Sequence, residues 1–138
     1  MASTDFVYSK ARIAIGSKQI DLTSATVNAM LVSNAYSPQP QADQYVSAIP
    51  AGAIVIRDLA ITGQGLSANG SFYGNLALLN SFISSLTVVA IILYVQTGND
   101  ATSQLLYYSS TGPGFPFQPL GFSYAITYDQ VSGGYFQA

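Results

Sequence analysis

Residues 86–108 read LTVVAIILYVQTGNDATSQLLYY, and this stretch decides the fold class of the chain. Its first part, residues 86–95, is an apolar run rich in Val and Ile that ends at the turn segment TGND, residues 97–100. An uninterrupted run of this length with β-branched residues predicts a strand that is buried on both faces. The second apolar part, LLYY at 105–108, predicts the returning strand. We therefore expect a hairpin with a long loop, placed centrally in a sheet.

Alternation of side chains predicts further strands on either side of this hairpin. The predicted strands cover 6–15, 26–32, 54–61, 71–85 and 122–129, and a short aromatic strand follows Gly133 and Gly134. In the first of them Lys10 and Arg12 alternate with Ala11 and Ile13, which is typical of a strand with one wet face. The segment 71–85 is ambiguous, because NLALLNSF within it also fits a short helix.

Turn-forming residues separate the predicted strands. The Gly-rich segment 63–70 is expected to end the third strand, and a short helical turn is expected at 45–49, before Pro50. Two loops complete the pattern: residues 33–44 combine two prolines with polar residues, and residues 110–121 are rich in Pro, Gly and aromatic residues.

The spaced short strands predict a single all-β domain over residues 1–138. We expect an antiparallel β-sandwich or barrel with long Pro/Gly-rich loops. Residues 1–5 are expected to form a flexible arm or an arm that contacts an assembly.

The chain is unusually poor in charge. Only 7% of its 138 residues are charged, whereas about 25% is typical of soluble domains. A surface of Ser, Thr, Asn, Gln and Tyr suits burial against neighbouring subunits, because low net charge otherwise favours precipitation. Composition therefore favours a component of an assembly, although some extracellular domains are also sparsely charged.

The charge pattern argues against nucleic acid and membrane as partners. The net charge is -2, and Lys10, Arg12 and Lys18 are the nearest approach to a basic patch. Phosphate binding needs several cations on one face. The apolar run is about half of the ~20 residues that a membrane-spanning helix needs. The N-terminal segment MASTDFVYSK also lacks the pattern of a secretory signal.

Residues that carry chemistry are scarce. The chain has no His and no Cys, and its acidic residues are six scattered Asp. General acid–base catalysis and Ser-His-Asp or Cys-His nucleophiles are therefore not expected, and we predict no enzyme, no catalytic residue and no cofactor. Asn99 and Asp100 with Thr97 offer oxygen ligands of the kind that calcium accepts, but turn formation explains them more simply. A sugar-binding platform at Phe115 and Phe117 is a further alternative.

Three parts of the chain resemble a family of small virion structural proteins of tailed bacteriophages. The segment IDLTSATVNAMLVSNAYSP at 20–38 is similar to the family's N-terminal strand and Ser-x-x-Tyr-x-Pro corner. The stretch 86–108 resembles its apolar strand, Thr-Gly turn and returning strand, and FSYAITYDQVSGGYFQA at 122–138 resembles its closing strand. The acidic-aromatic segment ADQYVSAI at 42–49 lacks the His often found in that family.

The resemblance implies a virion protein, and with the composition it predicts a capsid decoration (cement) protein that binds and stabilises the lattice of the major capsid protein. We expect a homo-oligomer, such as a trimer, on the capsid surface, assembled in the cytoplasm of the bacterial host. A tail or neck component and a host-surface or carbohydrate-binding module are the alternatives. Loops on a β scaffold commonly carry binding residues. The predicted partner contacts are Phe6, Tyr8, Tyr36, Pro38, Pro40, Phe115, Phe117 and Pro119.

Overall fold

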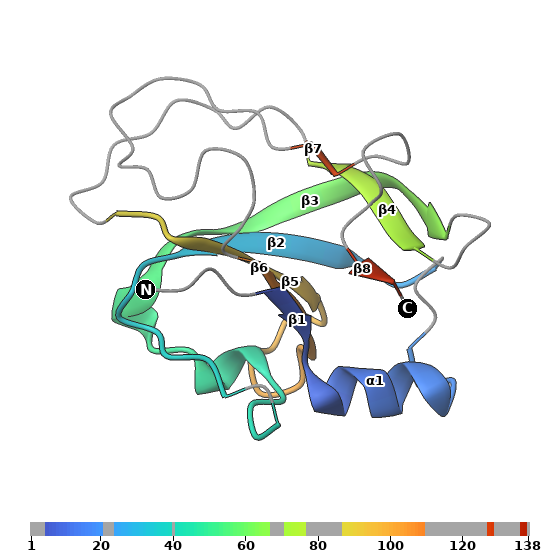
Figure 1. The fold of residues 1–138 in the computed structure, drawn as a ribbon, viewed down its shortest axis with the longest axis horizontal. Helices are drawn as coiled ribbons and strands as arrows, with labels where there is room; N and C mark the ends of the chain where they lie inside the picture. The colour runs from blue at the N-terminus through green and yellow to red at the C-terminus, as the bar shows by residue number, and fades with distance from the viewer. Residues whose placement is uncertain are drawn as a thin grey trace.

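A computed structural model describes residues 5–20, 24–39, 41–66, 71–76, 87–109, 127–128 and 136–137 of the chain. These residues form a largely β structure in which every strand pairing is antiparallel (Figure 1). The strands are β1 Asp5–Val7, β2 Val27–Val32, β3 Ile54–Leu66, β4 Ser71–Leu76, β5 Ala90–Val95, β6 Leu105–Ser109, β7 Thr127–Tyr128 and β8 Phe136–Gln137. The helical segments are α1 Ser9–Gly16 and the 3-10 turns η1 Val46–Ala48 and η2 Ala51–Ala53. The prediction of a mostly β, antiparallel chain is confirmed.

The strands follow one another in the sheet in the order β1-β6-β5-β2-β3-β4-β7, and β8 also pairs with β4. The predicted hairpin of residues 86–108 is present as β5 and β6, and β5 lies between β6 and β2. Within the part of the chain that the structure describes, β1 at one end of this order does not pair with β7 or β8 at the other. The described sheet is therefore open.

The centre of the sheet is buried on both faces. All six residues of β2 and all five of β6 are buried, and in β5 only Val95 is partly exposed. Successive side chains of a strand point to opposite faces, so burial of consecutive residues means that both faces are covered. This confirms the interpretation of the apolar run at 86–95 as a doubly buried strand.

The N-terminal strand prediction is wrong over most of its length. Only Asp5–Val7 is a strand, and Ser9–Gly16 is the helix α1. Ala11 and Ala14 are buried and Ile15 is partly buried, which is the i, i+3, i+4 spacing of one helical face. The same residues therefore fit both the two-residue period of a strand and the 3.6-residue period of a helix. Because Lys, Arg and Ala are also good helix formers, the segment forms a helix.

Helix α1 ends in a Schellman motif. The Gln19 N–H donates to the Ala14 carbonyl at 2.8 Å, and the Lys18 N–H donates to the Ile15 carbonyl at 3.2 Å. Lys18 has φ 66°, the left-handed conformation that glycine usually supplies at this position. Gly16 and Ser17 thus form the end of a helix.

Strand β3 is longer than predicted. It continues through Gly63 and Gly65 to Leu66, although we expected the Gly-rich segment to end it. Its register with β4 shifts between Thr62 and Gly65, so the glycines lie at an irregularity within the ladder rather than at its end.

Two further secondary-structure predictions are confirmed where the structure describes the residues. The helical turn expected at 45–49 is η1, and the first part of 71–85 is β4, a strand. Of the closing segments only β7 and β8 are described.

Helix α1 lies below the sheet in Figure 1, and both α1 and the two 3-10 turns contribute to the core. Ala11 of α1, Val46 of η1 and Ala53 of η2 belong to the same cluster of buried residues as β2, β5 and β6. No helix of the described part is long and apolar enough to cross a membrane.

Candidate interaction surface

A chain of hydrogen bonds that runs from the buried Tyr8 to the partly exposed Asp43 joins the N-terminal segment to the Pro-rich loop. The hydroxyls of Tyr8 and Tyr36 lie 2.8 Å apart, and the Tyr36 hydroxyl donates to Oδ2 of Asp43 at 2.6 Å. The same carboxylate oxygen accepts the Gln39 N–H at 3.0 Å. The ring of Tyr36 also meets the ring of Tyr108 on β6 in an edge-on contact, with 6.3 Å between centroids. The loop is thereby attached to both β6 and the start of α1.

The direction of this chain follows from its chemistry. A carboxylate only accepts hydrogen bonds, so the Tyr36 proton points to Asp43 and the Tyr36 oxygen accepts the Tyr8 proton. Burial is the largest cause that raises the pKa of both tyrosines above the ordinary value of 10.0, and the nearby negative charge of Asp43 adds to it. Both hydroxyls therefore stay protonated in the folded chain at neutral pH.

This arrangement corrects the predicted role of two contact residues. Tyr8 is 0% exposed and Tyr36 is 5% exposed, so both side chains hold the loop in place and are not accessible to a partner. The sequence presented them as aromatic residues in an arm and a loop, which are usually exposed. Pro38, in the same loop, is half-buried, and its contact role stays a prediction.

Five predicted contacts cannot be placed as side chains. The backbone of Phe6 pairs with Tyr108 in the ladder of β1 and β6, but its side chain lies outside the described residues. The residues Pro40, Phe115, Phe117 and Pro119 also lie outside the described residues.

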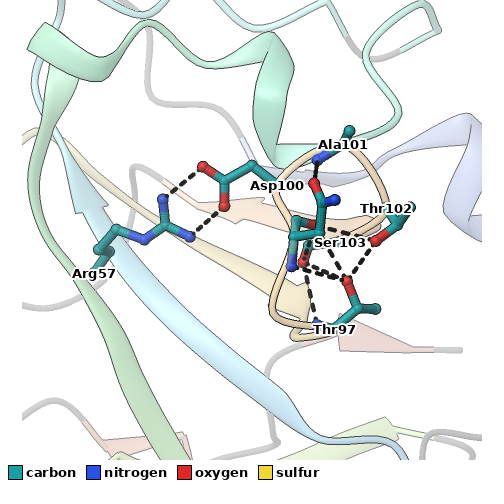
Figure 2. A network of polar contacts seen from close by, with 7 residues as sticks. Arg57, Thr97, Asp100, Ala101, Thr102 and Ser103 are labelled. Atoms are coloured by element: carbon teal, nitrogen blue, oxygen red, sulfur yellow. Dashed lines mark hydrogen bonds and ion pairs between the residues drawn. The ribbon is translucent and has the colours of Figure 1, made fainter.

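The loop that connects β5 to β6 is held together by its own side chains (Figure 2). The Asn99 carbonyl accepts from the Ser103 hydroxyl at 2.9 Å, and the Asn99 side-chain oxygen accepts the Ala101 N–H at 2.9 Å. The hydroxyls of Thr97 and Thr102 lie 2.6 Å apart. Gly98 has φ +88°, which an L side chain rarely adopts. The sequence prediction of turn chemistry at TGND is therefore confirmed.

An ion pair attaches this loop to β3. The guanidinium of Arg57 donates two hydrogen bonds to the Asp100 carboxylate, at 2.9 and 2.7 Å, as Figure 2 shows. Arg57 also lies over the ring of Tyr94, 5.9 Å from its centroid. The hydrogen bonds from Arg57 are the main cause that lowers the pKa of Asp100 below its ordinary 3.8.

Backbone hydrogen bonds attach the same loop to the segment around η1. The Ser47 N–H donates to the Asp100 carbonyl at 3.0 Å, and the Val46 N–H donates to the Ser103 carbonyl at 2.9 Å. On the return strand the Leu105 N–H donates to the Gln44 carbonyl at 2.8 Å. The hairpin loop and the 44–47 segment are thus joined into one ordered surface.

The oxygens that suggested calcium are already engaged in these contacts. Asp100 is paired with Arg57, and the side-chain oxygen of Asn99 accepts a backbone N–H. Among the described residues no group of three or more His, Cys, Asp or Glu could hold a metal ion. This loop therefore acts as a structural turn.

Sequence reasoning missed the residues that join these segments. Arg57 and Asp100 are separated by 43 positions, and Tyr8 and Tyr36 by 28. No local pattern connects such pairs. Neighbouring residues of a strand point to opposite faces, so Arg57 cannot pair with the adjacent Asp58 of β3.

Comparisons of the chain with protein-family models, with characterised proteins and with solved structures find no match.

Proposed function

We propose that this chain is a structural protein of a bacteriophage virion, and specifically a capsid decoration protein that binds the lattice of the major capsid protein. The observation that carries the proposal is a charge-poor sequence, with 7% charged residues, whose exposed loops are held in place by internal hydrogen bonds. The resemblance of residues 20–38 and 86–108 to small virion proteins of tailed phages supports the same assignment.

Ordered loops favour binding. A loop that is already fixed loses little conformational entropy when it meets a partner, so more of the contact energy appears as affinity. In this chain the Pro-rich loop is attached through Tyr36, and the hairpin loop is attached through Arg57–Asp100 and the backbone bonds to 44–47. Both loops would meet a capsid surface as preformed shapes.

The mechanism is mass action. A protein that binds only the assembled lattice stabilises that lattice by its binding free energy, repeated at every site. The proposal includes a homo-oligomer, such as a trimer, bridging neighbouring capsid subunits, and an N-terminal arm that contributes contacts. We also propose that the open sheet is part of a β-sandwich or barrel.

Copy number in purified particles tests the location. A decoration protein is expected at a number close to that of the major capsid protein, which quantitative mass spectrometry of intact particles measures. A few to tens of copies per particle would overturn the decoration assignment and favour a tail or neck component. Absence from particles, together with glycan binding by the isolated chain, would favour a carbohydrate-binding module.

Removal of the chain tests the mechanism. Particles assembled without it are expected to release their genome at a lower temperature, and purified chain added back is expected to restore the temperature of intact particles. Equal release temperatures for particles with and without the chain would contradict a stabilising role.

A further inference from the structure

Helix α1 presents an isoleucine to solvent. Ile13 is 65% exposed, and it is the one large hydrophobic residue that is exposed in the part of the chain that the structure describes. The opposite face of the helix is occupied by the buried Ala11 and Ala14. The smaller Ala11 and Ala14 occupy the positions of α1 that face the core, and the larger Ile13 is left on the solvent side.

Cations lie on both sides of Ile13. A helix turns about 100° per residue, so Lys10 lies about 60° to one side of Ile13 and Arg12 about 100° to the other. Both cations are exposed, and Lys18 is exposed just beyond the end of the helix. We name the group Lys10, Arg12, Ile13 and Lys18 the α1 surface.

The three cations of the α1 surface form no ion pair within the described part of the chain. The whole sequence has four Lys and Arg, and the fourth, Arg57, is paired with Asp100. The ion pair and side-chain hydrogen bonds found among the described residues do not include Lys10, Arg12 or Lys18. In a chain with net charge -2, the three Lys and Arg other than Arg57 therefore lie on, or just beyond the end of, one short helix that carries one exposed apolar side chain.

We propose that the α1 surface docks on an acidic patch of another protein, with Ile13 as the apolar anchor and the cations paired with carboxylates around it. The proposal rests on the proposed function in one respect, because the partner is taken to be a neighbouring protein of the same particle. An apolar contact enclosed by charged residues is the usual composition of a small protein interface, with its core excluded from water and its rim polar.

Other occupants fit the surface less well. Nucleic acid is held by several phosphate contacts, and three cations with an isoleucine at their centre offer few. An interfacial membrane helix needs a broad apolar face, whereas this one has a single exposed apolar residue. A second copy of the chain has no Glu, and among its six Asp the two whose side chains the structure describes, Asp43 and Asp100, are already engaged, so the described residues offer the α1 surface no acidic patch.

Binding of purified chain to particles assembled without it tests the proposal. Variant Ile13→Gln removes the anchor and keeps a good helix former, and the double variant Lys10→Gln/Arg12→Gln removes two positive charges. The matched control is Thr26→Glu/Thr87→Glu, which changes net charge by the same amount at two exposed positions outside α1 and outside both proposed contact loops. Circular dichroism and unfolding midpoints of each variant check that the fold is intact.

We expect Ile13→Gln to weaken binding about fivefold or more, which is the effect of losing an anchor residue. The double variant is expected to weaken it by a similar factor at low salt and less at high salt, because salt screens ion pairs. The control is expected to bind like wild type.

Three results would overturn the inference. Equal binding of wild type, Ile13→Gln and the double variant to particles would remove the α1 surface from the interface while leaving the proposed function intact. Failure of wild type itself to bind would overturn the proposed function and the inference with it. Self-association or binding to anionic lipid vesicles that both α1 variants abolish, without an effect on particle binding, would assign the surface to a different occupant.

Discussion

Replacing Tyr36 with phenylalanine removes the hydroxyl at the centre of the Tyr8–Tyr36–Asp43 chain. Two hydrogen bonds are lost together, the 2.6 Å donation to the Asp43 carboxylate and the 2.8 Å bond with Tyr8. A hydrogen bond to a charged group contributes about 1.5–3 kcal/mol and a neutral one about 1 kcal/mol. We therefore expect Tyr36→Phe to lower the free energy of unfolding by roughly 2–4 kcal/mol.

Two other substitutions calibrate this value. Tyr8→Phe removes the neutral bond and leaves Tyr36 donating to Asp43, so it should cost about 1 kcal/mol. Tyr45→Phe removes a partly buried bond to the adjacent Gln44 side chain and should cost less than about 1 kcal/mol. Urea unfolding followed by circular dichroism measures all three. A cost for Tyr36→Phe no larger than that for Tyr45→Phe would refute the account of the chain.

The same residues make stability depend on alkaline pH. The folded pKa of Tyr8 and Tyr36 is raised above the unfolded value of 10.0, so the unfolded chain releases these protons first. Their contribution is fully present below pH 10 and is lost as the pH rises from 10 toward the higher folded values. In this pH range each tyrosine lowers the free energy of unfolding by roughly 1.4 kcal/mol per pH unit. Tyr36→Phe should therefore reduce the slope of unfolding free energy against pH by about that amount. An unchanged slope would show that the hydroxyl is not buried in solution.

Three further predictions concern other parts of the chain. Arg57→Gln should raise the pKa of Asp100 toward 3.8 in an NMR titration. Because this pKa is lowered in the fold, the difference in stability from wild type should be fully present above pH 3.8 and should be lost as the pH falls from 3.8 through the lower folded pKa. At low salt the difference should not exceed about 1 kcal/mol, because Asp100 is 50% exposed. Lys18→Gly should raise the unfolding free energy by about 1 kcal/mol in urea titrations by relieving the left-handed backbone, whereas Lys18→Ala should not. Ile91 and Ile92 point to opposite faces of β5, so Ile91→Ala and Ile92→Ala test the two faces separately. Each should lower the free energy of unfolding by about 2–5 kcal/mol in the same assay, and a small decrease for either would mean that one face of the sheet is exposed to water.

The hairpin could be predicted from sequence because its information is local. An apolar run, a turn segment and a second apolar run are consecutive in 86–108, and each part has one reasonable interpretation. The order of the strands around the hairpin is a different matter. That β2, far earlier in the chain, lies beside β5 is set by the packing of the whole sheet and leaves no mark on either segment alone.

Helix α1 could not be predicted because two patterns overlap in SKARIAIG. Lys10 and Arg12 alternate with Ala11 and Ile13 as in a strand, while Ala11, Ala14 and Ile15 repeat as in a helix. Tertiary contact decides between them: the small alanines allow the helix to lie close to the core, and Ile13 is left outside. An alternating strand would have buried Ile13.

The candidate surface was predicted only in outline. Aromatic residues in loops were taken as contacts, yet the ring of Tyr36 is inside because its hydroxyl finds Asp43 and Tyr8 there. Hydrogen bonds between residues 28 or 43 positions apart depend on the finished fold. What composition did indicate, a surface with few charges, does not depend on which side chains pair.

The short strand β1 has a consequence for the behaviour of many copies held close together. A sheet edge with unpaired backbone groups invites another sheet to add to it, and a chain with 7% charged residues has little electrostatic repulsion to prevent this. In the described structure the sheet order ends at β1, which pairs with β6 over only three residues before the chain turns into α1 with its exposed Lys10 and Arg12. The change from strand to helix shortens the edge on which a second sheet could add, and the cations stand beside it. The three-residue β1 and the helix that follows it therefore leave little backbone at that edge for a second sheet to pair with.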